Sequence, residues 1–203
     1  RDRLKSAVIL AGLNSYGDTK VIEIKKSRDH TENMLLKNTN VIKITTGERT
    51  IIKIHGKKYL NNMQIKVPGD PSSAAFIVAL TLLNKNSSIK IKNVGLNETR
   101  IGFYQLLKKH GAKIKFSNLA KKNNERYGDI IVKTSKLKPI KASSEYYVKS
   151  TDEYPILFII ASLIKGTSIF KGINDLANKE SNRIFEMQKI LKQIGIKSTF
   201  SND

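Results

Sequence analysis

Two short segments of this sequence place cationic and hydroxyl side chains where a helix is expected to begin. They are Ser27-Arg28 and, further along the chain, Lys179-Glu180-Ser181-Asn182-Arg183. The first turn of a helix has unpaired backbone N–H groups and the positive end of the helix dipole, so anions bind there. Cations and hydroxyls beside such a turn are typical of phosphate or carboxylate recognition. Both segments are therefore candidate anion-binding sites.

Ordinary helix capping explains the same residues equally well. Asp29 and Ser181 have side chains suited to an N-cap, and Glu32 stands where a capping-box partner is expected. Asp152 can likewise cap a helix that begins near Pro155. The residues by themselves leave both interpretations open.

The elements that carry these segments recur along the chain. When the sequence is laid on itself with Gly111 on Gly195, each copy predicts an apolar helix, a strand, a second helix, a Gly and a short strand. A shorter copy, with Asn40 in the Gly position, stands at the start. The apolar helices are expected at 7–13, 72–80 and 155–163, the strands at 19–23, 88–92 and 167–171, and the second helices at 27–36, 97–107 and about 181–191. Repeats of helices facing a sheet of mixed strands predict an α/β fold.

The segments between the copies predict how the chain is divided. Residues 41–44 and 50–54 alternate like strands, and the polar stretch 118–126 is typical of a surface hairpin loop. Pro68-Gly69-Asp70-Pro71 has the punctuation of a domain boundary. We therefore expect one domain to end near residue 67 and another to begin at residue 68.

The charge balance raises the possibility of a nucleic-acid partner. The chain has 37 Lys and Arg against 17 Asp and Glu, a net charge of +20. The lysines are scattered singly, however, and they form no basic block or arginine–aromatic cluster. We therefore expect no nucleic-acid partner, and favour a small anionic ligand held by a few basic residues.

Residue content excludes several other classes of site. The chain has no Cys, which excludes disulfides, thiolate zinc sites and cysteine nucleophiles. Its three His are far apart in the sequence, so we expect no metal site. No apolar run reaches the roughly 18 residues that a membrane span needs, so we expect no membrane partner.

Five motifs in this order resemble those of the enolpyruvyl transferases, in particular the bacterial 5-enolpyruvylshikimate-3-phosphate (EPSP) synthases. They are Leu4 to Leu13, Ser27 to Leu35, Pro68 to Phe76, Asp152 to Leu157 and Lys179 to Arg183. The resemblance implies an inside-out α/β barrel (α+β in some schemes) of repeated βαβαββ units. It also implies that 1–67 is the latter part of one domain and 68–203 two repeat units of the second. The active site of the family lies between its two domains.

The resemblance further implies a reaction. Family members transfer the enolpyruvyl group of phosphoenolpyruvate to the 5-hydroxyl of shikimate 3-phosphate and release phosphate, without a metal or organic cofactor. In this chain Asp152 matches the proton acceptor that contacts the shikimate hydroxyls. Lys179 matches a lysine that stabilises charge, and Glu180 a glutamate that relays a proton. We expect no catalytic role for Glu153, because consecutive side chains point apart.

The substrate anions are assigned by the same resemblance. Arg183 matches the arginine that binds phosphoenolpyruvate, and it stands three residues after Glu180 on what is expected to be one helical face. Ser27 and Arg28 match the anchor of the shikimate 3-phosphate group. His30 is expected to be a structural residue at the helix start.

The chain also departs from the family pattern. Arg1-Asp2-Arg3 stands where the family has Ser-Ala-Gln, and Asn182 stands where it usually has Asp. The family's N-terminal Lys/Ser/Arg loop, its Gly-rich phosphoenolpyruvate loop and its C-terminal Asp-His-Arg region lie outside these residues. We therefore expect the isolated chain to be inactive, and the full-length protein to be a monomeric cytoplasmic enzyme.

Two alternatives remain at this point. One is another enolpyruvyl transferase, although the cell-wall enzyme of this fold uses a catalytic cysteine in many members and this chain has none. The other is a basic nucleic-acid-binding repeat protein, suggested by the net charge.

Overall fold

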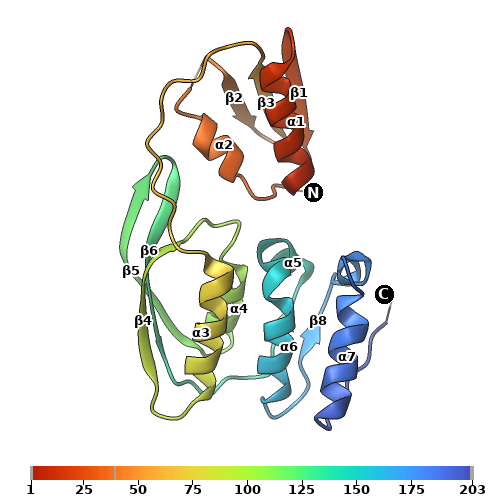
Figure 1. Ribbon diagram of the computed structural model, residues 1–203. Coiled ribbons are helices and arrows are strands. Elements are labelled where there is room, and N and C mark those ends of the chain that lie inside the picture. Colours follow the sequence, from red (N-terminus) through yellow and green to blue (C-terminus); the bar gives the residue numbers. More distant parts are fainter. Residues whose placement is uncertain (1, 39, 202–203) are drawn as a thin grey trace. The chain divides into compact units, whose positions relative to one another are not determined.

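The structure, a computed structural model, describes residues 2–38 and 40–201, and it divides the chain into two compact units (Figure 1). Unit 1 comprises Arg1–Pro68 and Ala120–Tyr127, and unit 2 comprises Gly69–Leu119 and Gly128–Asp203. Arg1 lies outside the described residues, and the departure from the family at Asp2 and Arg3 falls in the first turn of a helix. Each unit has a separate apolar core.

Residues 2–38 and 40–68 of unit 1 form two helices and one three-stranded sheet. The elements are α1 (Asp2–Asn14), β1 (Asp18–Glu23), α2 (His30–Leu35), β2 (Ile42–Thr46) and β3 (Thr50–His55). The strand order is β1-β3-β2, both pairings are antiparallel, and Val21 lies opposite Ile52. The strands are rich in β-branched residues, which pack well on a pleated surface.

The core of unit 1 forms where the two helices meet one face of this sheet. Alternate residues of β3, Ile52 and Ile54, are fully buried, as the period of two along a strand requires. Ile9 from α1 and Leu35 from α2 pack against them together with Ile42 from β2. The predicted order of helix, strand, helix and two extended segments is therefore confirmed in this copy.

Unit 2 contains the two other copies. Its elements are α3 (Pro71–Leu83), β4 (Ser88–Gly95), α4 (Gly102–Lys109), β5 (Lys113–Lys122), β6 (Glu125–Lys133), β7 (Lys141–Ala142), α5 (Ser144–Ser150), the 3₁₀ turn η1 (Thr151–Glu153), α6 (Tyr154–Ser162), β8 (Ile169–Phe170), the 3₁₀ turn η2 (Asn174–Asn178) and α7 (Arg183–Gln193). The tip of the β5–β6 hairpin, Ala120–Tyr127, is the exception, because it belongs to unit 1. One sheet has the order β4-β6-β5, and β7 pairs with β8 in parallel. Helix α6 packs against both α3 and α7 (Figure 1). The order α3-β4-α4 recurs as α6-β8-α7, as the repeat predicts.

Helix starts in unit 2 follow local side-chain chemistry. Asp70 caps α3, because its Oδ2 accepts a hydrogen bond from Ser73 N at 2.9 Å and Pro71 takes the first helical position. Helix α4 begins later than predicted, at Gly102. The delay arises because Asn97 Oδ1 accepts from both Thr99 N, at 2.9 Å, and Thr99 Oγ1, at 2.7 Å, which closes a turn outside the helix.

Two predictions about loops and strands were wrong. The stretch 118–126 is mostly strand, because Asn123 and Asn124, with φ of +52° and +62°, turn the hairpin in two residues. No strand follows Gly195, since residues 196–201 have no regular structure. The two glycines that closed the repeats do adopt positive φ, +100° at Gly111 and +76° at Gly195.

Among residues 2–38 and 40–201, no helix is both long enough and apolar enough to cross a membrane.

Candidate active site

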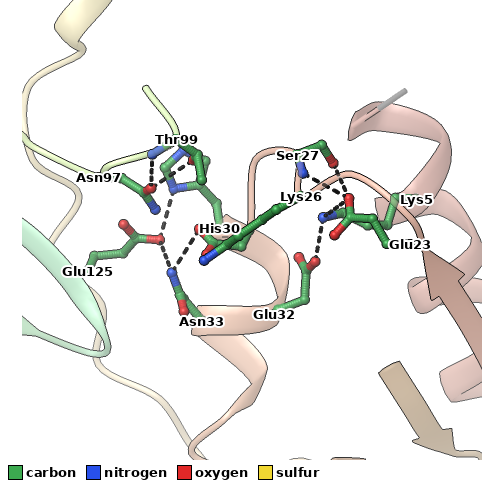
Figure 2. Close-up of polar contacts among 11 residues, drawn as sticks. Lys5, Glu23, Lys26, Ser27, His30, Glu32, Asn33, Asn97, Thr99 and Glu125 are labelled. Atoms are coloured by element: carbon green, nitrogen blue, oxygen red, sulfur yellow. Dashed lines mark hydrogen bonds and ion pairs between the residues drawn. The ribbon is translucent and has the colours of Figure 1, made fainter. Parts of the chain in front are cut away.

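The Ser27-Arg28 loop connects β1 to α2 in unit 1, and a carboxylate holds it in place. Ser27 is buried, and its backbone N and its Oγ both donate to Glu23 Oε1, at 3.0 and 2.5 Å (Figure 2). A serine has one backbone N–H and one hydroxyl proton, so Glu23 takes both donors of Ser27. Arg28, next in the loop, is half-buried. The loop is therefore anchored at Ser27, and Arg28 supplies its charge.

A buried lysine completes this anchor. Lys5 of α1 is 7% exposed, and its Nζ lies 3.1 Å from Glu23 Oε1 and 2.6 Å from Glu32 Oε1 (Figure 2). Burial alone would lower the pKa of Lys5, but the two carboxylates outweigh it and hold the pKa above its ordinary value. Glu32 binds Lys5 and is not the capping-box partner that the sequence suggests. This cluster ties α1, the end of β1 and α2 together.

Helix α2 is shorter than the predicted helix at 27–36, so Ser27 and Arg28 do not lie in its first turn. It begins at His30, three residues after Ser27, and has six residues. Asp29 occupies the N-cap position, but its side chain makes no capping bond. The Asp29 carboxylate instead lies 3.0 Å from Lys26 Nζ and accepts from Asn33 Nδ2 at 3.2 Å. Ser27 and Arg28 thus precede a short helix, and helix-dipole attraction is no longer a reason to place an anion there.

His30 has the structural surroundings that the sequence suggests. Its Nδ1 lies 2.8 Å from Glu125 Oε1, and the same oxygen accepts from Asn33 Nδ2 at 3.1 Å (Figure 2). His30 and Asn33 are both on α2, so Glu125 joins its first and second turns.

In unit 2 an arginine lies between two carboxylates. Arg183 is the first residue of α7, and its Nη2 donates to Glu180 Oε2 at 3.2 Å. Its Nη1 lies 3.8 Å from Asp152 Oδ1, in η1. Glu180 lies before the helix, so the predicted shared helical face is wrong, although the two side chains form an ion pair. The structure brings together three of the predicted site residues, Asp152, Glu180 and Arg183.

The capping predictions on both sides of this cluster were wrong. The cap of α7 is Asn182 and not Ser181, since Asn182 Oδ1 accepts from Phe185 N at 3.0 Å. Asn182, which stands where the family usually has Asp, thus has a structural role as the cap of α7. Asp152 does not cap α6, because Glu153 occupies that position and makes no side-chain capping bond. The Asp152 side chain is 45% exposed and faces Arg183 instead.

Lys179 is held by a residue that sequence reasoning missed. Its Nζ lies 2.7 Å from Asp175 Oδ2, which also accepts from the Tyr147 hydroxyl at 2.8 Å. Burial, and after it the hydrogen bond to Asp175, raise the pKa of Tyr147. The spacing of four residues between Asp175 and Lys179 was the available signal. Asp175 thereby links Lys179 to α5.

The arrangement suits proton transfer next to bound anions. A guanidinium has five N–H donors in a planar fork, and only some of the five face Glu180 and Asp152. Carboxylates accept or relay protons when they reach the reacting group, and nearby cations stabilise developing negative charge. Repeated helix–strand units carrying such an arginine–carboxylate cluster define an α/β protein suited to chemistry on small anions.

Comparison with known proteins gives the family. The model of the EPSP synthase (3-phosphoshikimate 1-carboxyvinyltransferase) family matches residues 2–203. The chain belongs to the EPSP synthase family.

Relatives and solved structures agree with this assignment. The chain is 42% identical over 195 residues to the 3-phosphoshikimate 1-carboxyvinyltransferase of Zymomonas mobilis, covering 96% of this chain and 43% of that protein. It is 41% identical over 193 residues to the Bacillus subtilis protein of the same name, covering 95% and 44%. The structure of EPSP synthase from Acinetobacter baumannii matches with a TM-score of 0.88 at 35% identity, over 100% of this chain and 45% of that one. The chain thus spans less than half the length of these relatives, and the α/β class is confirmed.

Proposed function

We propose that this chain forms part of an enzyme that transfers the enolpyruvyl group of phosphoenolpyruvate to shikimate 3-phosphate. The 5-oxygen of shikimate 3-phosphate bonds to C2 of phosphoenolpyruvate while the methylene carbon takes up a proton, which gives a tetrahedral intermediate. The resulting methyl group then loses a proton as the bond from C2 to the phosphate oxygen breaks, so the proton lost by the hydroxyl is balanced by one that leaves with phosphate. The observation that carries the proposal is the Asp152–Arg183–Glu180 cluster in a chain of the EPSP synthase family.

The residues of unit 2 are assigned to the reacting centre. Asp152 accepts the proton of the 5-hydroxyl, and its partial exposure, which leaves it accessible to a substrate, supports this role. Glu180 relays a proton at the methylene carbon, and Lys179 stabilises charge on the substrate oxygens. Arg183 binds phosphoenolpyruvate with the donors that remain on its guanidinium.

The residues of unit 1 are assigned to the phosphate of shikimate 3-phosphate. Arg28 supplies a cation that can make two charge-assisted hydrogen bonds to a phosphate. Ser27 contributes a hydrogen bond only if its hydroxyl turns away from Glu23, because Glu23 takes both of its donors. The main contribution of unit 1 is therefore the charge of Arg28.

The full-length protein is proposed to be a two-domain enzyme. Residues 1–67 belong to one domain and 68–203 to the other, and the enzyme acts without a metal or organic cofactor. It is a cytoplasmic monomer with two small-molecule substrates, and neither a nucleic acid nor a membrane is its partner. The isolated 203-residue chain shows no turnover, since other substrate contacts of the family lie outside it.

The test is steady-state kinetics of the full-length protein. Phosphate release should require both substrates, and a nucleotide-sugar acceptor should not replace shikimate 3-phosphate. Replacing Asp152 by Asn keeps the shape but removes the base, so kcat should fall about 10²-fold or more. Robust turnover by the isolated chain, or full kcat in the Asp152→Asn variant, would contradict the assignment.

Two arginine variants separate the anion sites. Arg28→Ala removes a charge-assisted contact worth roughly 1.5–3 kcal/mol, so shikimate 3-phosphate should bind about 10- to 150-fold more weakly. Arg183→Ala should weaken the binding of phosphoenolpyruvate. It should leave the binding of shikimate 3-phosphate, measured without phosphoenolpyruvate, nearly unchanged. Arg49→Ala, at the exposed β2–β3 turn, is the matched control for loss of charge. If the Arg28 and Arg183 variants weaken both ligands equally, the effect is general electrostatics and there are not two separate sites. Steep salt-dependent DNA binding would favour the nucleic-acid alternative.

A further inference from the structure

A buried carboxylate lies next to Asp152, and the proposed reaction does not use it. Glu153 is the last residue of η1 and is 2% exposed, whereas the Asp152 side chain is 45% exposed. The two side chains thus point in different directions from one short turn. A fully desolvated carboxylate is costly unless it is hydrogen-bonded, so its partners must stabilise it.

Those partners come from two distant parts of unit 2. Glu153 Oε1 accepts the hydroxyl proton of Ser72, in the first turn of α3. Ser72 Oγ in turn accepts from Arg100 Nη2 at 2.7 Å, and the same nitrogen donates to Asp70 Oδ1 at 3.0 Å. Glu153 therefore joins η1 to the capped start of α3 and to the turn before α4.

The donor and acceptor of each hydrogen bond between Arg100, Ser72 and Glu153 follow from which groups carry protons. Arg100 can only donate, so the single proton of Ser72 is directed to Glu153. Burial raises the pKa of Glu153, while Ser72 and Arg100 oppose that rise. In the described part of the chain the other oxygen, Oε2, is buried and has no hydrogen-bond partner. Glu153 thus has one strong attachment, and that attachment determines where η1 lies.

We propose that Glu153 is a positioning residue for Asp152. Its hydrogen bond to Ser72 fixes η1 on α3, and η1 then presents the adjacent Asp152 carboxylate to Arg183. A turn of three residues has little structure of its own, so losing this attachment lets Asp152 move away from the reacting centre. The catalytic part of this inference rests on the proposed function, and the geometric part stands without it.

The experiment compares Glu153→Ala with Glu153→Gln in the full-length protein. The alanine variant should lose about 10- to 100-fold in kcat with a much smaller change in KM for phosphoenolpyruvate. The glutamine variant keeps an oxygen that accepts from Ser72, so its kcat should stay within about threefold of the parent. Glu145→Ala, which removes an exposed carboxylate from neighbouring α5, is the matched control and should be unchanged.

Two further measurements distinguish positioning from general stability. The Asp152→Asn, Glu153→Ala double variant should have a kcat less than threefold below that of Asp152→Asn alone, because Glu153 acts through Asp152. In crystal structures, the Asp152 carboxylate should lie away from Arg183 in Glu153→Ala and beside Arg183 in Glu153→Gln. If the alanine variant does not fold, Ser72→Ala removes the same hydrogen bond and should have the same effects.

Several results would overturn the inference. Equal losses in the alanine and glutamine variants, or additive losses in the Asp152→Asn background, would show a purely structural role. An Asp152 carboxylate that stays beside Arg183 in Glu153→Ala would do the same. If the parent protein shows no transfer, the proposed function fails, and the crystal structures still decide whether Glu153 positions Asp152.

Discussion

Replacing Lys5 by Met tests whether the buried ion cluster holds the Ser27-Arg28 loop. The change removes the cation between Glu23 and Glu32, whose side chains are 12% and 4% exposed. Methionine fills much of the space of the lysine stem, so the main effect is electrostatic. Two buried carboxylates then lack their counter-ion.

The size of the loss follows from the geometry. Removing one partner of a buried ion pair costs about 3–5 kcal/mol, because a charge is left uncompensated. Both donors of Ser27 still reach Glu23, which lessens the effect, so we expect about 3 kcal/mol. The cost should fall mainly on unit 1.

The pH dependence provides a second signature. The folded-state pKa of Lys5 lies above its ordinary value of 10.5. The stabilisation is therefore complete below pH 10.5 and is lost as the pH rises through the higher folded-state pKa. The free energies of unfolding of the parent and Lys5→Met proteins should differ most near neutral pH and converge above pH 10.5.

Urea unfolding of the full-length protein, with hydrogen exchange at the amides of β1 and β3, measures this effect. Lys20→Met, an exposed lysine on β1, controls for loss of charge and should change stability by less than about 0.5 kcal/mol. Glu32→Gln added to Lys5→Met should recover part of the loss. A loss below about 1 kcal/mol, or one that does not shrink at alkaline pH, would refute the reasoning.

Two further predictions concern stability in the full-length protein. Asn182→Ala should cost about 1 kcal/mol, because the side chain accepts from Phe185 N, whereas Asn182→Asp should be nearly neutral; equal urea midpoints for the two would contradict this. The pKa of Asp129 is lowered to about 2, first by the backbone N–H of Asn93 and then by Lys90. Its contribution is therefore present above pH 3.8 and lost as the pH falls towards 2, so acid titration of Asp129→Asn should show a shallower loss than the parent.

Periodicity predicted the helices and strands well, because the burial of one face repeats at a fixed residue spacing along each element. The alternation at 50–54 buries Ile52 and Ile54, and the positive φ of Gly111 and Gly195 follows from their place after helices. The ends of the helices and strands were predicted less well. The turn closed by Asn97 depends on side-chain hydrogen bonds, and the two-residue turn at Asn123-Asn124 depends on positive φ; neither leaves a periodic signal.

Residue type and motif selected the candidate site residues, and the structure adds the contacts that connect them. Arg183 and Glu180 were expected on one helical face; they form an ion pair instead, with Glu180 before the helix. Contacts across long separations could not be deduced from spacing. Lys5 meets Glu23 18 residues away, and Ser72 meets Glu153 81 residues away.

The two candidate anion sites therefore use carboxylates in opposite ways. In unit 1, Glu23 is occupied by Lys5 and by both donors of Ser27, so it serves to hold the loop and leaves the positive charge to Arg28. In unit 2, Asp152 and Glu180 are well exposed beside Arg183, and the adjacent buried Glu153 does the holding. Burial thus separates the supporting carboxylates from the exposed ones to which we assign proton transfer in the proposed function. A carboxylate must remain accessible to transfer a proton, whereas a buried carboxylate that holds a loop needs at least one strong hydrogen bond or ion pair to offset its loss of hydration.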